Sequence, residues 1–146
     1  MKILEAESSD IPLLTKLMTQ FNVEESIELP VEVMKKTIEL SFSNRNYIQT
    51  FIAYEGNSVV GYIHICYSFS FEYQGLEASI DEIFILKEFR GLGLAKVLFD
   101  DIENEIKSRG AVAIRADVSD DKPWLDGFYK KLGFCQVSYR PYYKQL

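Results

Sequence analysis

The sequence contains few of the residues on which many common sites are built. Among its 146 residues there are two cysteines, one histidine and one tryptophan. Cys66 and Cys135 lie far apart and outside any metal-like or redox-like spacing, so the sequence predicts neither a disulfide framework nor a metal centre. We therefore expect a reducing compartment, and no catalysis by a thiol.

Long apolar runs are also missing. No segment approaches the about 18 consecutive apolar residues of a membrane span. The first five residues, Met1 to Glu5, lack the apolar stretch of a signal peptide. We therefore expect a cytoplasmic protein with no membrane partner.

Basic residues are outnumbered: 16 lysines and arginines face 22 aspartates and glutamates, for a formal net charge of −6. A nucleic-acid partner calls for a basic face, so we expect none. The acidic surplus suits a cationic partner, although it also serves solubility alone.

What the sequence does contain is a core and a regular order of elements. Hydrophobic residues make up 47% of the chain, enough for one globular domain over residues 1–146. Residue patterns predict strands over 2–6, 47–54, 59–71, 77–86, 111–118, 134–139 and 142–143, and helices over 9–18, 30–42, 93–109 and 123–132. This order predicts an α/β fold, with a mixed sheet of about seven strands and helices on both faces.

The most informative segment spans residues 79–95. A strand-like apolar run leads into Arg90-Gly91-Leu92-Gly93, and an apolar-periodic helix follows. A glycine turn that opens a helix leaves backbone N–H groups unpaired and adds the positive end of the helix dipole. Arg90 adds a planar cation suited to phosphate oxygens. The segment therefore predicts an anion site, with a plain surface turn as the alternative.

Two familiar phosphate loops do not fit this turn. A dinucleotide fingerprint requires a third glycine where Lys96 stands. A P-loop requires Gly-Lys-Ser or Gly-Lys-Thr, and the chain contains neither. The anion must belong to another kind of ligand.

The segment Arg90-Gly91-Leu92-Gly93-Leu94-Ala95 resembles the acetyl-CoA pyrophosphate loop of the GNAT superfamily of N-acetyltransferases, and residues 128–134 resemble a second signature of that family. The resemblance implies acetyl-CoA as co-substrate and a mostly antiparallel sheet with a splayed central strand pair. It implies cofactor contacts from Ile83, Phe84, Ile85, Arg90, Gly91, Leu92, Gly93, Leu94, Ala95 and Lys96. Lys122 stands where the family commonly has an asparagine near the pantetheine arm; Asp120 and Ser119 are the alternatives there.

The resemblance also assigns catalytic roles. It places the Tyr129 hydroxyl near the cofactor sulfur, and a phenol is protonated at neutral pH, so we expect Tyr129 to be the general acid. An alkylammonium acceptor must first lose a proton, and Asp81 and Glu82 are the available carboxylates. Adjacent strand residues point to opposite faces, so we expect at most one to face the acetyl site directly. We favour Asp81, acting directly or through water.

His64 is the only histidine, and its position among strand residues favours a packed, hydrogen-bonded imidazole over a catalytic one. A backbone N–H near Ile83 or Phe84 is the candidate for an oxyanion donor.

The acceptor is less clearly encoded. Residues 67–70 and 81–85 resemble most the small polyamine and diamine acetyltransferase branch. Acidic and aromatic residues suited to such amines are Glu24, Glu25, Glu28, Glu32, Glu72, Tyr67 and Phe71. We therefore expect a small primary amine as acceptor; a protein N-terminus or lysine, and a CoA-binding sensor without turnover, are the alternatives. The aromatic C-terminus, 139–143, predicts either a homodimer interface or the completion of the sheet.

Overall fold

The computed structural model describes residues 1–138, 141–142 and 144–145. This part of the chain has five strands: β1 (Lys2–Glu5), β2 (Ile48–Glu55), β3 (Ser58–Ser70), β4 (Gly75–Ile85) and β5 (Ala111–Ala116). The helices are α1 (Ile11–Glu24), α2 (Val31–Ser43), α3 (Leu94–Ser108) and α4 (Trp124–Lys131), with short 3-10 turns η1 (Ser8–Asp10) and η2 (Lys87–Phe89).

The strands form one sheet in the order β1-β2-β3-β4-β5. The first three pairings are antiparallel, and β4 pairs with β5 in parallel. The parallel pair is joined by α3, because a parallel connection needs a crossover. The mixed, mostly antiparallel sheet predicted from the sequence is confirmed.

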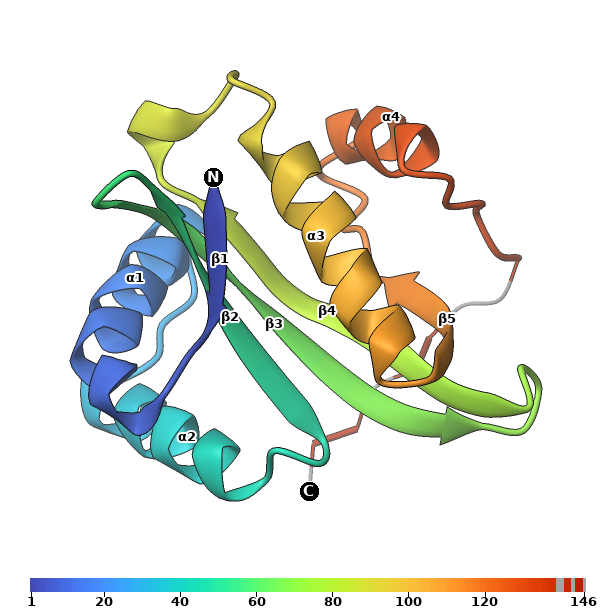
Figure 1. The fold of residues 1–146 in the computed structure, drawn as a ribbon, viewed down its shortest axis with the longest axis horizontal. Helices are drawn as coiled ribbons and strands as arrows, with labels where there is room; N and C mark the ends of the chain where they lie inside the picture. Colours follow the sequence, from blue (N-terminus) through green and yellow to red (C-terminus); the bar gives the residue numbers. More distant parts are fainter. Residues whose placement is uncertain (139–140, 143, 146) are drawn as a thin grey trace.

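Helices cover both faces of this sheet, with α1 and α2 behind it and α3 and α4 in front (Figure 1). The alternation of strand residues decides which face each side chain joins. Ile52 and Tyr62 pack in one buried cluster with Leu14 of α1, whereas Phe51 and Ile63 pack with residues of α3 in another.

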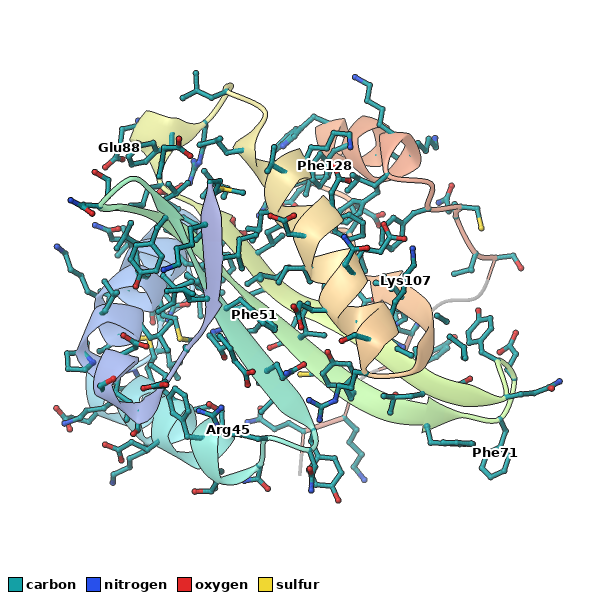
Figure 2. The ribbon with its side chains drawn as sticks, in the orientation of Figure 1. Arg45, Phe51, Phe71, Glu88, Lys107 and Phe128 are labelled. Carbon is teal, nitrogen blue, oxygen red and sulfur yellow. The ribbon has the colours of Figure 1, made fainter. Side chains whose placement is uncertain are left out.

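The β3–β4 hairpin is the longest in the fold and extends past the helices (Figure 1). Phe71 stands at its tip and is 90% exposed (Figure 2). Its ring makes an edge contact with Phe69 at 5.5 Å between centroids.

The expectation of about seven strands is corrected. Residues 134–138 form no strand among the described residues, and neither do residues 141–142. A strand needs a partner as well as an alternating pattern, and Pro141 removes one ladder donor from this segment. Tyr139, Arg140 and Tyr143 lie outside the described residues, so the predicted role of the aromatic C-terminus in a dimer or in the sheet stays a prediction.

Across the described ranges, none of the helices is both long enough and apolar enough to cross a membrane.

Candidate active site

The site lies where β4 and β5 separate. The two strands pair from Leu76 to Ile80 on β4, and β5 ends at Ala116. Beyond Ile80, β4 continues to Ile85 and pairs only with β3 among the described residues. The predicted splayed strand pair is therefore present, and it opens a cavity of about 430 Å³ between the strand ends.

Charged residues dominate one part of this cavity. Its lining includes five carboxylates and two cations: Glu24, Glu25, Asp81, Glu82, Asp117, Arg90 and Lys122. Its aromatic lining residues are Phe21, Phe84, Trp124, Phe128 and Tyr129. The cavity thus brings together residues from α1, β4, the glycine turn and α4.

A β-bulge sets the direction of the two β4 carboxylates. His64 pairs with Glu82 while the next residue, Ile65, pairs with Ile80, which leaves Asp81 as the extra residue. Because of this insertion, Glu82 lies on the same face as Tyr62 and His64, the face covered by α1. Both carboxylates line the cavity, so the expectation that at most one of them would face the site fails. Simple strand alternation does not hold across a bulge.

The two carboxylates differ in their surroundings. Asp81 is an exposed residue. Partial desolvation of its carboxyl group and the negative charge of the nearby Asp117 both raise its pKa. Glu82 is 20% exposed and accepts a hydrogen bond of 2.7 Å from the Tyr62 hydroxyl. Desolvation raises the pKa of Glu82, and the hydrogen bond from Tyr62 acts against this rise. Glu82 is therefore the more firmly held carboxylate.

Tyr129 lies on α4 at the opposite side of the splay. It is 9% exposed, and its ring makes edge contacts with Phe128 and Phe134 at 5.2 and 5.3 Å between centroids. Burial raises the pKa of its phenol, so the hydroxyl keeps its proton well above neutral pH. This is the state that a proton donor requires.

The glycine turn has the conformation that its sequence predicted. Gly91 and Gly93 both have φ of 77°, a left-handed backbone that side chains disfavour. Gly93 is the N-cap of α3, and its carbonyl accepts the first helical bonds, from the N–H groups of Lys96 at 3.1 Å and Val97 at 3.4 Å. The N–H groups that precede these bonds cannot find an acceptor within the helix. A Cβ placed on either glycine would meet no atom within 4 Å, so the turn has open space beside it. Exposed N–H groups, open space and the helix dipole fit a pyrophosphate.

Other predicted cofactor residues surround this turn. Phe84 and Ile85 are buried, Ile83 is half-buried, and all three line the cavity. Leu92 is exposed, Leu94 is half-buried, and Ala95 lines the cavity. Lys96 is exposed and pairs with Asp100 at 2.6 Å on the next turn of α3.

Arg90 is held more tightly than the sequence indicated. Its Nε donates a hydrogen bond of 2.7 Å to the Ile85 carbonyl, and its guanidinium lies 5.4 Å from the Phe84 ring centroid. Its terminal nitrogen pairs with Glu24 at 2.7 Å. A bound phosphate would therefore share Arg90 with Glu24.

Lys122 likewise has a partner at the end of α1, because its ammonium group pairs with Glu25, the residue directly after that helix. Two neighbouring glutamates at the end of α1 thus bind the two cations of the cavity. Glu28 and Glu32, which the sequence placed beside them as candidates, do not line it. Asp117 and Trp124 line the cavity although no sequence pattern had marked them.

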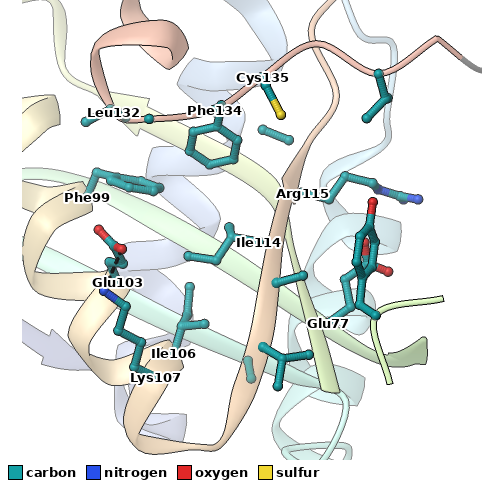
Figure 3. A pocket seen from close by; sticks show the side chains of 17 residues that line it. Glu77, Phe99, Glu103, Ile106, Lys107, Ile114, Arg115, Leu132, Phe134 and Cys135 are labelled. Carbon is teal, nitrogen blue, oxygen red and sulfur yellow. Dashed lines mark ion pairs between the residues drawn. The ribbon is translucent and has the colours of Figure 1, made fainter. Parts of the chain in front are cut away.

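A second cavity, of about 470 Å³, lies along β5 and is also lined by Glu77 of β4 (Figure 3). Phe99, Ile114 and Phe134 line it, and Lys107 pairs with Glu103 there at 2.7 Å. None of the residues predicted for catalysis or cofactor binding lies in it. Among the described residues, no group of three or more histidine, cysteine, aspartate or glutamate side chains could hold a metal ion.

Known protein families provide an independent comparison. The model of the Acetyltransferase (GNAT) family matches residues 13–134. The chain belongs to this family. The prediction of a GNAT acetyltransferase is thereby confirmed, and with it the broad class of acyltransferases.

Individual relatives show how far the likeness extends. N-alpha-acetyltransferase 30 of Schizosaccharomyces pombe is 32% identical over 95 residues, which are 64% of this chain and 63% of that protein. Two solved structures share the fold. A possible acetyltransferase from Clostridium difficile 630 has a TM-score of 0.89 at 22% identity, covering 99% of this chain and 97% of that chain. A predicted acetyltransferase from Clostridium acetobutylicum, solved with acetyl-CoA, has a TM-score of 0.80 at 22% identity, covering 98% and 95%.

Neither the family model nor these relatives point to the polyamine branch in particular.

Proposed function

We propose that this protein transfers the acetyl group of acetyl-CoA to a primary amine by direct attack. The observation that carries the proposal is that one cavity, opened by the splay of β4 and β5, is lined by Tyr129, by both β4 carboxylates, and by Arg90 and Ala95 on either side of the glycine turn. Proton donor, proton acceptors and anion cradle therefore border the same space.

Acetyl-CoA fits the groups that the chain provides. The first turn of α3 offers N–H groups for the pyrophosphate, and Arg90 offers a cation shared with Glu24. Ile83 to Ile85 lie on a stretch of β4 whose β5 side carries no strand among the described residues, so its backbone can bind the pantetheine arm. When bound, acetyl-CoA supplies an activated acetyl thioester.

The chain's own residues handle the protons. An alkylammonium group is almost fully protonated at pH 7, and Glu82 or Asp81 accepts that proton before attack. Tyr129 keeps its proton at neutral pH and gives it to the leaving thiolate. Lys122 is paired with Glu25 and has no part in these proton transfers.

The acceptor we propose is a small cationic amine of the diamine or polyamine type. Five carboxylates against two cations leave the cavity with a surplus of negative charge. Both cations are already paired with glutamates, so the remaining carboxylates face any incoming ammonium group directly.

A protein N-terminus is the second candidate acceptor. The observation in its favour is the 32% identity to a relative named as an N-alpha-acetyltransferase. An N-terminal amine carries one positive charge and an extended backbone, whereas a diamine carries two charges and no peptide groups. The two acceptors can therefore be separated by their charge and length.

One panel tests both candidates. CoA release is measured with a thiol reagent against diamines, polyamines, monoamines of matched length, and short peptides with free or formylated N-termini. We expect the highest kcat/KM for a diamine or polyamine. Turnover confined to peptides with a free N-terminus would replace the small-amine proposal. Binding of acetyl-CoA without turnover of any acceptor would favour a sensor.

We also propose a homodimer, which sedimentation of the same preparation tests directly.

A further inference from the structure

A row of polar side chains leads from the interior of the sheet to the cavity. Thr50 of β2, His64 of β3 and Glu82 of β4 are partners in register across three neighbouring strands. Tyr62 lies two residues before His64 and therefore on the same face. The row ends at Glu82, which lines the cavity.

Each member of the row lies close to the next. Thr50 Oγ1 and His64 Nδ1 are 2.7 Å apart. His64 Nε2 lies 3.9 Å from Glu82 Oε2, the same oxygen that accepts the 2.7 Å hydrogen bond from Tyr62. Tyr62 is fully buried, and Thr50 and His64 are 6% and 5% exposed. Only Glu82 reaches the solvent side of the row.

His64 Nε2 is the one fully buried side-chain nitrogen or oxygen without a hydrogen-bond partner among the described residues. A buried polar atom left unpaired is costly, so its position calls for an explanation. The atom faces Glu82, the carboxylate nearest to it. Because the row borders the cavity, the unpaired atom belongs to the surroundings of the site.

The tautomer follows from the two neighbours of the ring. Burial lowers the pKa of His64 to about 4, so the imidazole is neutral at pH 7 and carries one N–H. If the Thr50 hydroxyl donates to Nδ1, the ring proton lies on Nε2 and faces the Glu82 carboxylate. The other tautomer would direct a lone pair at that carboxylate, which is repulsive. Electrostatics therefore assign the proton to Nε2.

We propose that His64 is a positioning residue for Glu82 and acts together with Tyr62. Tyr62 holds Glu82 Oε2 by its hydrogen bond, while His64 Nε2–H, 3.9 Å from the same oxygen and beyond hydrogen-bond distance, favours the ionised carboxylate electrostatically. Oε1 is left free to take the proton of the amine. This inference rests on the proposed acetyl transfer and selects Glu82 over Asp81 as its base. In the step itself, an N–H bond of the ammonium group breaks and an O–H bond forms on Glu82. The electron pair stays on nitrogen for attack, and the proton later leaves to solvent through the cavity.

Several titratable or charged groups lie beside Glu82 or line the same cavity. They are Tyr62 and His64 from β3, Asp81 from β4, Glu24 at the end of α1 and Glu25 directly after it, and Arg90, Asp117 and Lys122 from the surrounding loops. A useful variant must therefore change the contact from His64 without changing any of these charges. Replacements of His64 by neutral amides meet that condition.

Two such amides separate the two ring nitrogens. In His64→Asn the amide lies near the position of Nδ1 and keeps a partner for Thr50, but nothing replaces Nε2–H. In His64→Gln the longer amide places an N–H near the position of Nε2. We expect His64→Asn to raise the pKa of Glu82 by about 0.5, since the N–H dipole that faces the ionised carboxylate at 3.9 Å is lost. We expect His64→Gln to leave the pKa of Glu82 close to its wild-type value.

The first measurement uses the protein without acetyl-CoA. Carbon-13 NMR of glutamate carboxyl groups follows the titration of Glu82, assigned by its disappearance in Glu82→Gln. Equal pKa values of Glu82 in wild type, His64→Asn and His64→Gln would overturn the proposal. Amide spectra of each variant establish that it is folded.

The second measurement is the pH profile of kcat/KM for the best amine. We expect its acid limb to move to higher pH in His64→Asn and in Tyr62→Phe, to vanish in Glu82→Gln, and to remain in Asp81→Asn. Loss of the acid limb in Asp81→Asn with its retention in Glu82→Gln would overturn the assignment of Glu82. If wild type acetylates no amine, the proposed function fails, while the NMR titration still decides the role of His64.

Discussion

Glu24, the last residue of α1, forms an ion pair with Arg90 at 2.7 Å. Arg90 immediately precedes the glycine turn, so this pair joins the proposed acceptor side of the cavity to the proposed cofactor side. Any phosphate that binds at the turn competes with Glu24 for the guanidinium. Cofactor affinity should therefore depend on both residues.

We expect Arg90→Gln to weaken CoA binding about tenfold, the effect of losing a charge-assisted hydrogen bond of about 1.5 kcal/mol. Glu24→Gln should act in the opposite direction. Because a partly exposed ion pair is worth at most about 1 kcal/mol, the gain in CoA affinity should be about two- to fivefold. Isothermal titration calorimetry with CoA measures both effects.

The double variant and a distant pair serve as controls. In Arg90→Gln the additional Glu24→Gln change should have no effect on CoA affinity, because its target is gone. Glu5→Gln removes a comparable surface pair, Arg45–Glu5 at 3.1 Å, and should leave CoA affinity unchanged. Weaker CoA binding in Glu24→Gln would contradict competition at Arg90.

Removal of the Tyr129 hydroxyl tests the proton donor. We expect Tyr129→Phe to lower kcat about 100-fold, the lower range for a general acid, while the Kd for acetyl-CoA changes little. The ring and its contacts with Phe128 and Phe134 remain. Tyr47→Phe, at a residue 67% exposed, is the matched control and should keep full activity. Unchanged kcat in Tyr129→Phe would remove this residue from the proposed mechanism.

Gly93 tests the anion cradle. Its φ of 77° makes an alanine cost about 1–2 kcal/mol in unfolding free energy, without any steric clash. We expect Gly93→Ala to lower the Tm and to weaken CoA binding, because the N–H groups of the α3 N-terminus shift. Gly110, with φ of 87° at the far end of α3, is the control for strain alone.

Gly110→Ala should lower the Tm by a similar amount and leave CoA affinity unchanged. Equal CoA affinity in wild type and Gly93→Ala would show that the turn does not bind the cofactor.

The pH dependence of stability tests the state of His64. The pKa of His64 in the folded protein is about 4, below the ordinary value of 6.5. Between these two pH values the imidazole is therefore mostly protonated in the unfolded chain and mostly neutral in the folded protein. The corresponding stability is complete above pH 6.5 and is lost as the pH falls toward 4. The loss reaches about 3 kcal/mol at most.

We expect urea unfolding of the wild type to show this loss between pH 7 and 4.5, and His64→Gln to lack it. Equal pH dependence in the two proteins would mean that folding does not lower the pKa of His64.

The sequence predicted most of the fold and part of the site, for identifiable reasons. The glycine turn before α3 and the apolar spacing of α3 are local patterns, and local patterns specify local structure. Predicted strand and helix bounds up to α4 therefore agree with the structure to within two residues, except that α1 runs to Glu24, six residues beyond its predicted end. Residues 134–138 were mistaken for a strand because alternation does not show whether a partner edge is available.

The site residues divide along the same line. Tyr129 and the turn at Gly91 and Gly93 belong to motifs of contiguous residues, so sequence alone placed them. The pairing of Glu24 with Arg90 and of Glu25 with Lys122 joins segments far apart in the chain. Such contacts cannot be predicted from a local sequence pattern.

The sequence by itself determined that this chain forms an α/β sheet with a glycine cradle at the start of one helix and resembles a GNAT acetyltransferase. Only the tertiary structure decided which groups meet at that cradle. A single inserted residue at Asp81 turns Glu82 toward His64 and Tyr62, and the end of α1 brings two glutamates to the cations of the cavity. Backbone motifs are determined by neighbouring residues, whereas charge pairing and buried hydrogen bonds depend on how distant segments pack.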